Sequence, residues 1–149
     1  MSNRHLSRTI AMQTLYEWQF NHHSQKMQAL IDKNLKNNFI TDDDGINFVQ
    51  EIVRGVTKNL ESLDKTIEKY APEWPIDKIT GVDLAILRIG VYEIMFAKQN
   101  PPKVVINESI EMAKTFCGES AGKFVNGVLG SIYNKTQEAV NNKQEVKNE

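Results

Sequence analysis

The stretch that decides the fold is GVDLAILRIGVYEIMF, residues 81–96. Its apolar residues recur at the three- and four-residue spacing of an α-helix and cover most of the circumference. A helix that is apolar on nearly all sides must be surrounded by other elements, so we expect this one to lie at the centre of the molecule. Thr80 directly precedes it and can cap its free N–H groups, with Asp83 as the partner residue of a capping box.

Amphipathic patterns of the same period occur on both sides of this segment. They predict helices over residues 4–20, 25–35, 46–56, 60–70, 102–116 and 120–132. No alternating apolar and polar run is bounded by a two-residue turn, so strands are not expected. The fold class predicted is all-α, a bundle of about seven helices. The residues expected to be buried include Ile86, Ile89, Phe116, Val125 and Leu129.

Length and composition restrict the type of protein. The chain has 149 residues, the size of one domain, and a net charge of −1, so an attraction to nucleic acid has to come from local charge placement. The single cysteine, Cys117, excludes an internal disulfide framework and fits a reducing compartment. Residues 1–20 carry no apolar signal segment, and no apolar run is long enough to span a membrane. We therefore expect a cytoplasmic protein with no membrane association.

The motifs that suggest catalysis lack the context that catalysis requires. Residues 118–122, GESAG, match the G-x-S-x-G nucleophile elbow, but that elbow follows a strand, and a helix is predicted here. The three histidines, His5, His22 and His23, lie near the N-terminus without cysteine or acidic partners at metal-ligand spacing. We therefore expect no catalytic residue, no metal site and no cofactor.

The first helix is locally basic. Arg4 and Arg8 are four residues apart and so share a helix face, with His5 beside them. Glu17 is the only acidic residue among the first 31. Such a face can follow phosphates while aromatic rings stack on unpaired bases, although two arginines alone also fit an ordinary solvated surface.

Four strings in the chain resemble the NusB family of bacterial transcription antitermination factors. They are AMQTLYEWQ at 11–19, DLAILRIGVYE at 83–93, PKVVINESIEMAK at 102–114 and KFVNGVL at 123–129. They occur in the family's order and spacing, and the resemblance covers about residues 4–133. It implies two packed three-helix subdomains over residues 1–133. Residues 134–149 lie outside the resemblance, and their polar composition with little apolar content predicts a disordered tail or a frayed helix.

The resemblance also implies a function and partners. Family members are non-enzymatic factors that bind single-stranded boxA RNA in the leaders of ribosomal RNA transcripts, together with a ribosomal protein called NusE. The complex acts on elongating RNA polymerase to form an antitermination complex. A homodimer that buries the RNA face is left open.

Site residues are carried over by position. The RNA-binding residues implied are Arg4, His5, Arg8, Tyr16, Tyr70, Lys123 and Phe124. The residues implied to face NusE are Asp77 and Asp83. This chain departs from the family where Leu6 and Ser7 interrupt the N-terminal arginine cluster and where Ser120 replaces a common acidic residue.

Two alternatives keep the same fold. One is the NusB-like RNA-binding domain of a ribosomal-RNA methyltransferase, which would need a further catalytic domain after Glu149. The other is a protein-interaction bundle without RNA binding. Phe124 has two interpretations as well, because its spacing to Val128 and Ile132 also fits a core stripe.

Overall fold

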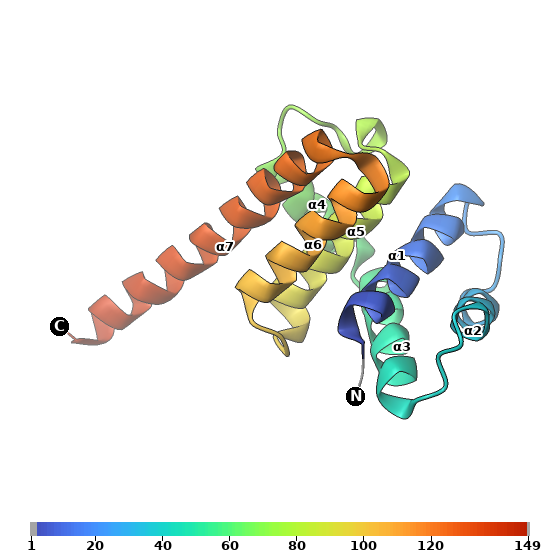
Figure 1. The fold of residues 1–149 in the computed structure, drawn as a ribbon. Helices are drawn as coiled ribbons and strands as arrows, with labels where there is room; N and C mark the ends of the chain where they lie inside the picture. Colours follow the sequence, from blue (N-terminus) through green and yellow to red (C-terminus); the bar gives the residue numbers. More distant parts are fainter. Residues whose placement is uncertain (1–2, 149) are drawn as a thin grey trace.

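The computed structural model describes residues 3–148, which form seven α-helices and contain no β-strand (Figure 1). The helices are α1 (Arg4–Phe20), α2 (Met27–Asn37), α3 (Asp43–Lys58), α4 (Leu60–Tyr70), α5 (Gly81–Tyr92), α6 (Pro102–Cys117) and α7 (Glu119–Asn148). A 3₁₀ turn, η1 (Ile76–Lys78), precedes α5, and a π-helical segment, η2 (Glu93–Ala97), follows it. The prediction of an all-α fold is confirmed.

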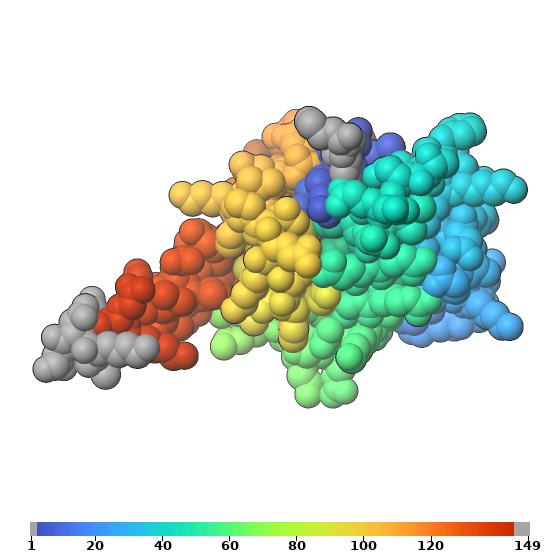
Figure 2. Space-filling model, turned by 90° about the horizontal axis from the view of Figure 1, so that it is seen from below, coloured from blue at the N-terminus to red at the C-terminus, as the bar shows by residue number. Residues whose placement is uncertain are grey.

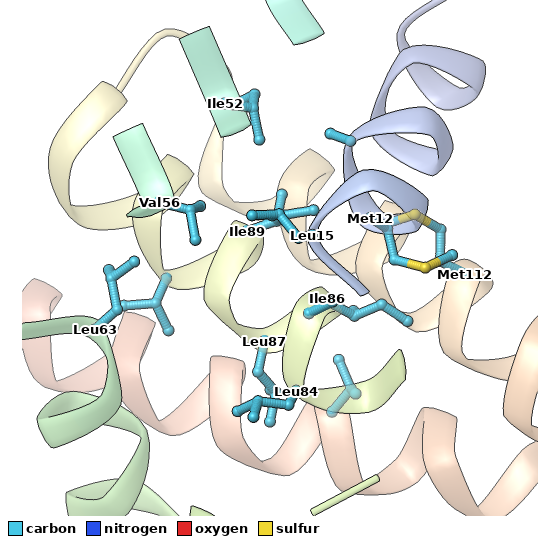
Figure 3. Packing of buried hydrophobic residues seen from close by; sticks show 14 of the residues in the cluster. Met12, Leu15, Ile52, Val56, Leu63, Leu84, Ile86, Leu87, Ile89 and Met112 are labelled. Atoms are coloured by element: carbon cyan, nitrogen blue, oxygen red, sulfur yellow. The ribbon is translucent and has the colours of Figure 1, made fainter. Parts of the chain in front are cut away.

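Helix α5 lies at the centre, as its apolar sequence predicts. It packs against α1, α3, α4, α6 and α7. Figure 3 shows Ile86 and Ile89 of α5 within one hydrophobic cluster that also contains Leu15 of α1 and Leu63 of α4. All four side chains are at most 3% exposed, so the driving force for folding is concentrated around this helix.

The helices form two groups that pack through α5. Helices α1–α3 lie together on one side, and α4–α7 lie on the other (Figure 1). Gly55 of α3 allows a close approach, because a Cβ there would lie 2.1 Å from Cζ of Tyr92. The two groups share one hydrophobic cluster and therefore behave as packed subdomains, not as separate domains.

The helix ends follow the signals in the sequence. The Asp83 backbone N–H donates to Thr80 Oγ1 over 3.4 Å at the start of α5. Helix α6 begins at Pro102, where the missing N–H costs nothing. Gly118 ends α6 with φ of +95°, in the left-handed region that favours glycine.

One residue predicted to be buried is exposed. Phe116 is 52% exposed, although Ile86, Ile89, Val125 and Leu129 are buried as expected. Phe116 continues the apolar spacing of α6, but it lies in the last turn, where the chain reverses into α7. Periodicity gives the direction of a side chain and not whether another helix covers it.

The last helix is longer than the predicted range of residues 120–132. Helix α7 continues to Asn148 and does not end near residue 133. Its polar residues 134–144 are exposed apart from half-buried Thr136. Figure 2 shows this part of α7 projecting from the body of the molecule. Met1, Ser2 and Glu149, which the predicted domain and tail include, lie outside the described residues.

Candidate nucleic-acid interface

Three of the predicted RNA-binding residues line one surface hollow of about 340 Å³. Tyr70 comes from the end of α4, and Lys123 and Phe124 come from the first turns of α7. Trp74, in the loop after α4, completes the surface that we call the Tyr70 hollow. The Trp74 and Phe124 rings meet edge to face, with centroids 6.0 Å apart and an interplanar angle of 60°.

Trp74 is a site residue that sequence reasoning missed. It lies between Pro72 and Pro75. Its backbone N–H donates to the backbone oxygen of Ala71 over 3.0 Å, which closes a tight turn. This turn holds the indole at the surface, where it is 52% exposed. The sequence does contain a sign of this, because Trp74 lies in a short loop between two prolines, outside any amphipathic helix that could bury it.

Arg4 and His5 do not line the Tyr70 hollow, and both are partnered by acids. Arg4 Nη2 is 3.2 Å from Asp44 Oδ1, and its guanidinium lies over the Phe48 ring, 4.2 Å from the centroid. His5 Nδ1 is 2.6 Å from Glu108 Oε2. The Arg4 and His5 side chains remain 38% and 54% exposed, so both are accessible to a ligand.

Arg8 does not share this exposure, which corrects the prediction that it contacts RNA. Its side chain is 2% exposed and forms a bidentate ion pair with Glu93, with Nε–Oε2 at 2.8 Å and Nη2–Oε1 at 3.0 Å. Asn100 also donates to Glu93 Oε1, over 3.2 Å. A guanidinium sealed in this way cannot reach a phosphate, so Arg8 joins α1 to η2 instead.

Tyr16 lies where α1 approaches the start of α5. A Cβ on Gly81 would lie 2.8 Å from Tyr16 Cε2, so the ring packs directly on that backbone. The Phe20 ring is 5.8 Å away, centroid to centroid. Tyr16 is half-buried, and it does not line the Tyr70 hollow.

The two aspartates predicted to face a protein partner differ in exposure. Asp77 is exposed and shares a hollow of about 550 Å³, the Asp77 hollow, with Glu68 and Gln19. Asp83 is only 7% exposed, and no described residue forms a hydrogen bond with its Oδ1. Asp83 therefore offers little charge at the surface, and its assignment to the protein-partner surface stays a prediction.

Asp83 also affects Cys117. Burial raises the pKa of the Cys117 thiol above its ordinary value, and the negative charge of Asp83 raises it further. A raised pKa disfavours the thiolate, the form that acts as a nucleophile. Among residues 3–148, no group of three His, Cys, Asp or Glu side chains is placed to hold a metal ion. No helix in that range is both long and apolar enough to cross a membrane.

A seven-helix domain that presents aromatic rings and a lysine around an open hollow is a binding module. The comparison with known families specifies which one. The model of the NusB family matches residues 5–134, which is most of the chain. The chain therefore belongs to the NusB family.

Individual relatives agree with this assignment. The transcription antitermination protein NusB of Clostridium novyi (strain NT) is 39% identical over 132 residues, covering 87% of this chain and 97% of the relative. The protein of the same name from Clostridium acetobutylicum is 38% identical, covering 91% and 98%. A solved complex of the antitermination factors NusB and NusE with double-stranded RNA is similar, with a TM-score of 0.80, 30% identity and coverage of 89% and 96%.

Proposed function

We propose that this chain is a transcription antitermination factor. It binds single-stranded boxA RNA in ribosomal RNA leader transcripts together with the ribosomal protein NusE, and it promotes processive transcription by RNA polymerase. Membership of the NusB family over residues 5–134 supports this role, as do the names of its relatives. The role requires no cofactor and no catalysis, and it places the protein in the cytoplasm, where bacterial transcription occurs.

The observation that carries the proposal is the Tyr70 hollow. It groups three aromatic rings and one exposed lysine on the surface, where unpaired bases can stack and a phosphate can be neutralised. Arg4 supplies a further cationic contact, His5 supplies an exposed imidazole that can form a hydrogen bond, and Tyr16 adds an aromatic ring on α1. Arg8 acts indirectly, because its buried ion pair fixes the helix that carries Arg4 and His5.

NusE binds at the Asp77 hollow in this proposal. Asp77 and Glu68 place two carboxylates around that hollow, beside apolar Ile76 and Leu84. Arg88 also lines it, but its guanidinium is buried and paired with Asp64. Acidic groups around an apolar floor suit a basic ribosomal protein, because charge steers the encounter and burial of apolar surface holds the complex. The RNA and protein surfaces are then adjacent, since the loop that carries Trp74 continues directly into η1.

A titration with end-labelled boxA RNA, with and without NusE, tests the proposal. We expect measurable binding that tightens when NusE is present, because two linked surfaces contribute. The methyltransferase-domain interpretation predicts binding to ribosomal RNA without help from NusE. The interaction-bundle interpretation predicts NusE binding without RNA. Absence of RNA binding in both titrations would refute the proposed function.

Phe124→Ala tests the hollow directly. Loss of one stacking platform should weaken boxA binding about 5- to 150-fold, since a stacked base contributes roughly 1–3 kcal/mol. Phe124 is half-buried, so the free energy of unfolding should fall by less than about 2 kcal/mol, below the cost for a fully buried ring. Phe39→Ala, at a ring that is 87% exposed and outside the hollow, is the matched control and should alter neither quantity. A Phe124 variant that loses stability but keeps RNA affinity would assign the ring to the core.

A further inference from the structure

A second hollow shares the Trp74 and Phe124 rings with the Tyr70 hollow. It has a volume of about 310 Å³, and Asp83, Lys78, Thr80 and Ser120 contribute to its lining. We call it the Asp83 hollow. Its size is at the lower end of the range for small-ligand sites.

The two aromatic rings belong to both hollows. Trp74 and Phe124 line the Asp83 hollow as well as the Tyr70 hollow. They therefore border both spaces. An aromatic ring can stack a base, so a single strand that passes over these two rings can place bases in both hollows.

Asp83 gives the second hollow a chemical preference. Its side chain is more than nine-tenths buried, and its Oδ1 has no hydrogen-bond partner among the described residues. An ionised carboxylate only accepts hydrogen bonds, so an occupant that presents donors would satisfy it. The terminal torsion of an aspartate is broad, so a small rotation can exchange the positions of its two oxygens.

The rim of the hollow disfavours a cationic occupant. Lys78 is exposed at the rim. The N-terminal turns of α5 and α7 also border the hollow, through Thr80 and Ser120, and helix N-termini carry partial positive charge. A lysine or arginine from a partner protein would meet this positive rim, whereas a nucleotide would place its phosphate there and its base inside.

We propose that the Asp83 hollow is a guanine-selective subsite for single-stranded RNA. Guanine is the base whose pairing edge carries two adjacent donors, the ring N1–H and the exocyclic amino group, which match the two oxygens of a carboxylate. Adenine, cytosine and uracil each place an acceptor beside their donor, and that acceptor would face the negative charge. This inference rests on the proposed RNA-binding function and names the base that the function selects.

The test uses the Trp18→Phe variant, in which Trp74 is the only tryptophan. Its fluorescence is titrated with ten-residue uridine strands that carry one central G, A, C or U. We expect the G strand to bind about 5- to 150-fold more tightly than the others, the range for a good bidentate base contact. Asp83→Asn should bring the four affinities within about twofold, because an amide offers one donor and one acceptor. Asp32→Asn removes the same charge at an exposed residue outside all three hollows and should leave the preference intact.

A change in the RNA tests the same contact without altering the protein. Inosine lacks the exocyclic amino group and should lose most of the preference, whereas 7-deazaguanosine keeps both donors and should retain it. If the protein binds no RNA even with NusE, the proposed function fails and the inference fails with it. Binding that is equal for the four bases, or a G preference that survives in Asp83→Asn, overturns the inference alone. If Asp83→Asn weakens NusE binding and leaves the relative affinities for the G, A, C and U strands unchanged, Asp83 belongs to the protein interface instead.

Discussion

Removal of the buried arginine should separate stability from RNA binding. Arg8 and Glu93 are each 2% exposed and share two hydrogen bonds of 2.8 and 3.0 Å. Arg8→Ala leaves a buried carboxylate whose remaining donor is Asn100, at 3.2 Å. Breaking a buried ion pair from one side costs about 3–5 kcal/mol, and the Asn100 hydrogen bond favours the lower half of that range. For a chain of this length, the melting temperature should fall by roughly 6–16 °C.

Urea denaturation followed by circular dichroism measures this loss. The matched control is Arg4→Ala, on the same helix face. Its ion pair with Asp44 is largely exposed, so that pair and the contact with Phe48 together should contribute no more than about 1.5 kcal/mol. A double-mutant cycle of Arg8→Met with Glu93→Gln should give a coupling of about 0.5–3 kcal/mol, because the two residues are in direct contact.

RNA titrations at several salt concentrations complete the test. Arg4→Ala should lower the log–log salt slope by roughly 0.7, which corresponds to one phosphate contact on a single strand. Arg8→Ala should leave the slope unchanged under conditions where the variant is folded. The reasoning is refuted if Arg8→Ala unfolds within about 1 kcal/mol of the unaltered protein and also shows the reduced slope, because Arg8 would then be a phosphate contact.

Two further predictions concern packing and reactivity. Gly55→Ala should destabilise the protein by about 1–3 kcal/mol, because the new Cβ would overlap the Tyr92 ring. Gly130→Ala should instead stabilise α7 by up to about 1 kcal/mol, because the nearest atom to its new Cβ is 3.7 Å away. Thermal melts of the two variants check this contrast. Cys117 should react with iodoacetamide more slowly than a free thiol at pH 8, because its raised pKa leaves less thiolate. Asp83→Asn should lower the pH midpoint of that reaction but not restore the ordinary value, since burial still raises the pKa; an unchanged midpoint would show that Asp83 does not influence the thiol.

Much of the fold could be predicted because local signals determine it. The apolar period fixes which residues are helical, and Thr80 and Gly118 mark helix ends through their own chemistry. The central position of α5 follows from its composition alone. These features depend on residues within one or two turns of each other, so a single sequence is sufficient to locate them.

The site was less predictable because it depends on distant partners. Arg8 and Arg4 look equivalent in the sequence, yet Arg8 is buried by Glu93, a residue 85 positions away. Asp83 looks like an exposed residue of the first helical turn, yet the hollow beside α7 encloses it. Trp74 becomes a site residue because Phe124 lies against it across 50 positions of sequence. Such pairings are decided by tertiary packing, which a local pattern does not contain.

The projecting part of α7 should unfold locally more easily than the rest of the molecule. The whole helix is 30 residues, or about 45 Å, but residues 134–144 are almost entirely exposed. A helix segment that buries little apolar surface is only marginally stable in water. Its amide hydrogens should therefore exchange with solvent through fraying, whereas those around Val125 and Leu129 should exchange only in larger unfolding events. One continuous helix would then contain a protected half and an unprotected half, with the boundary near Tyr133.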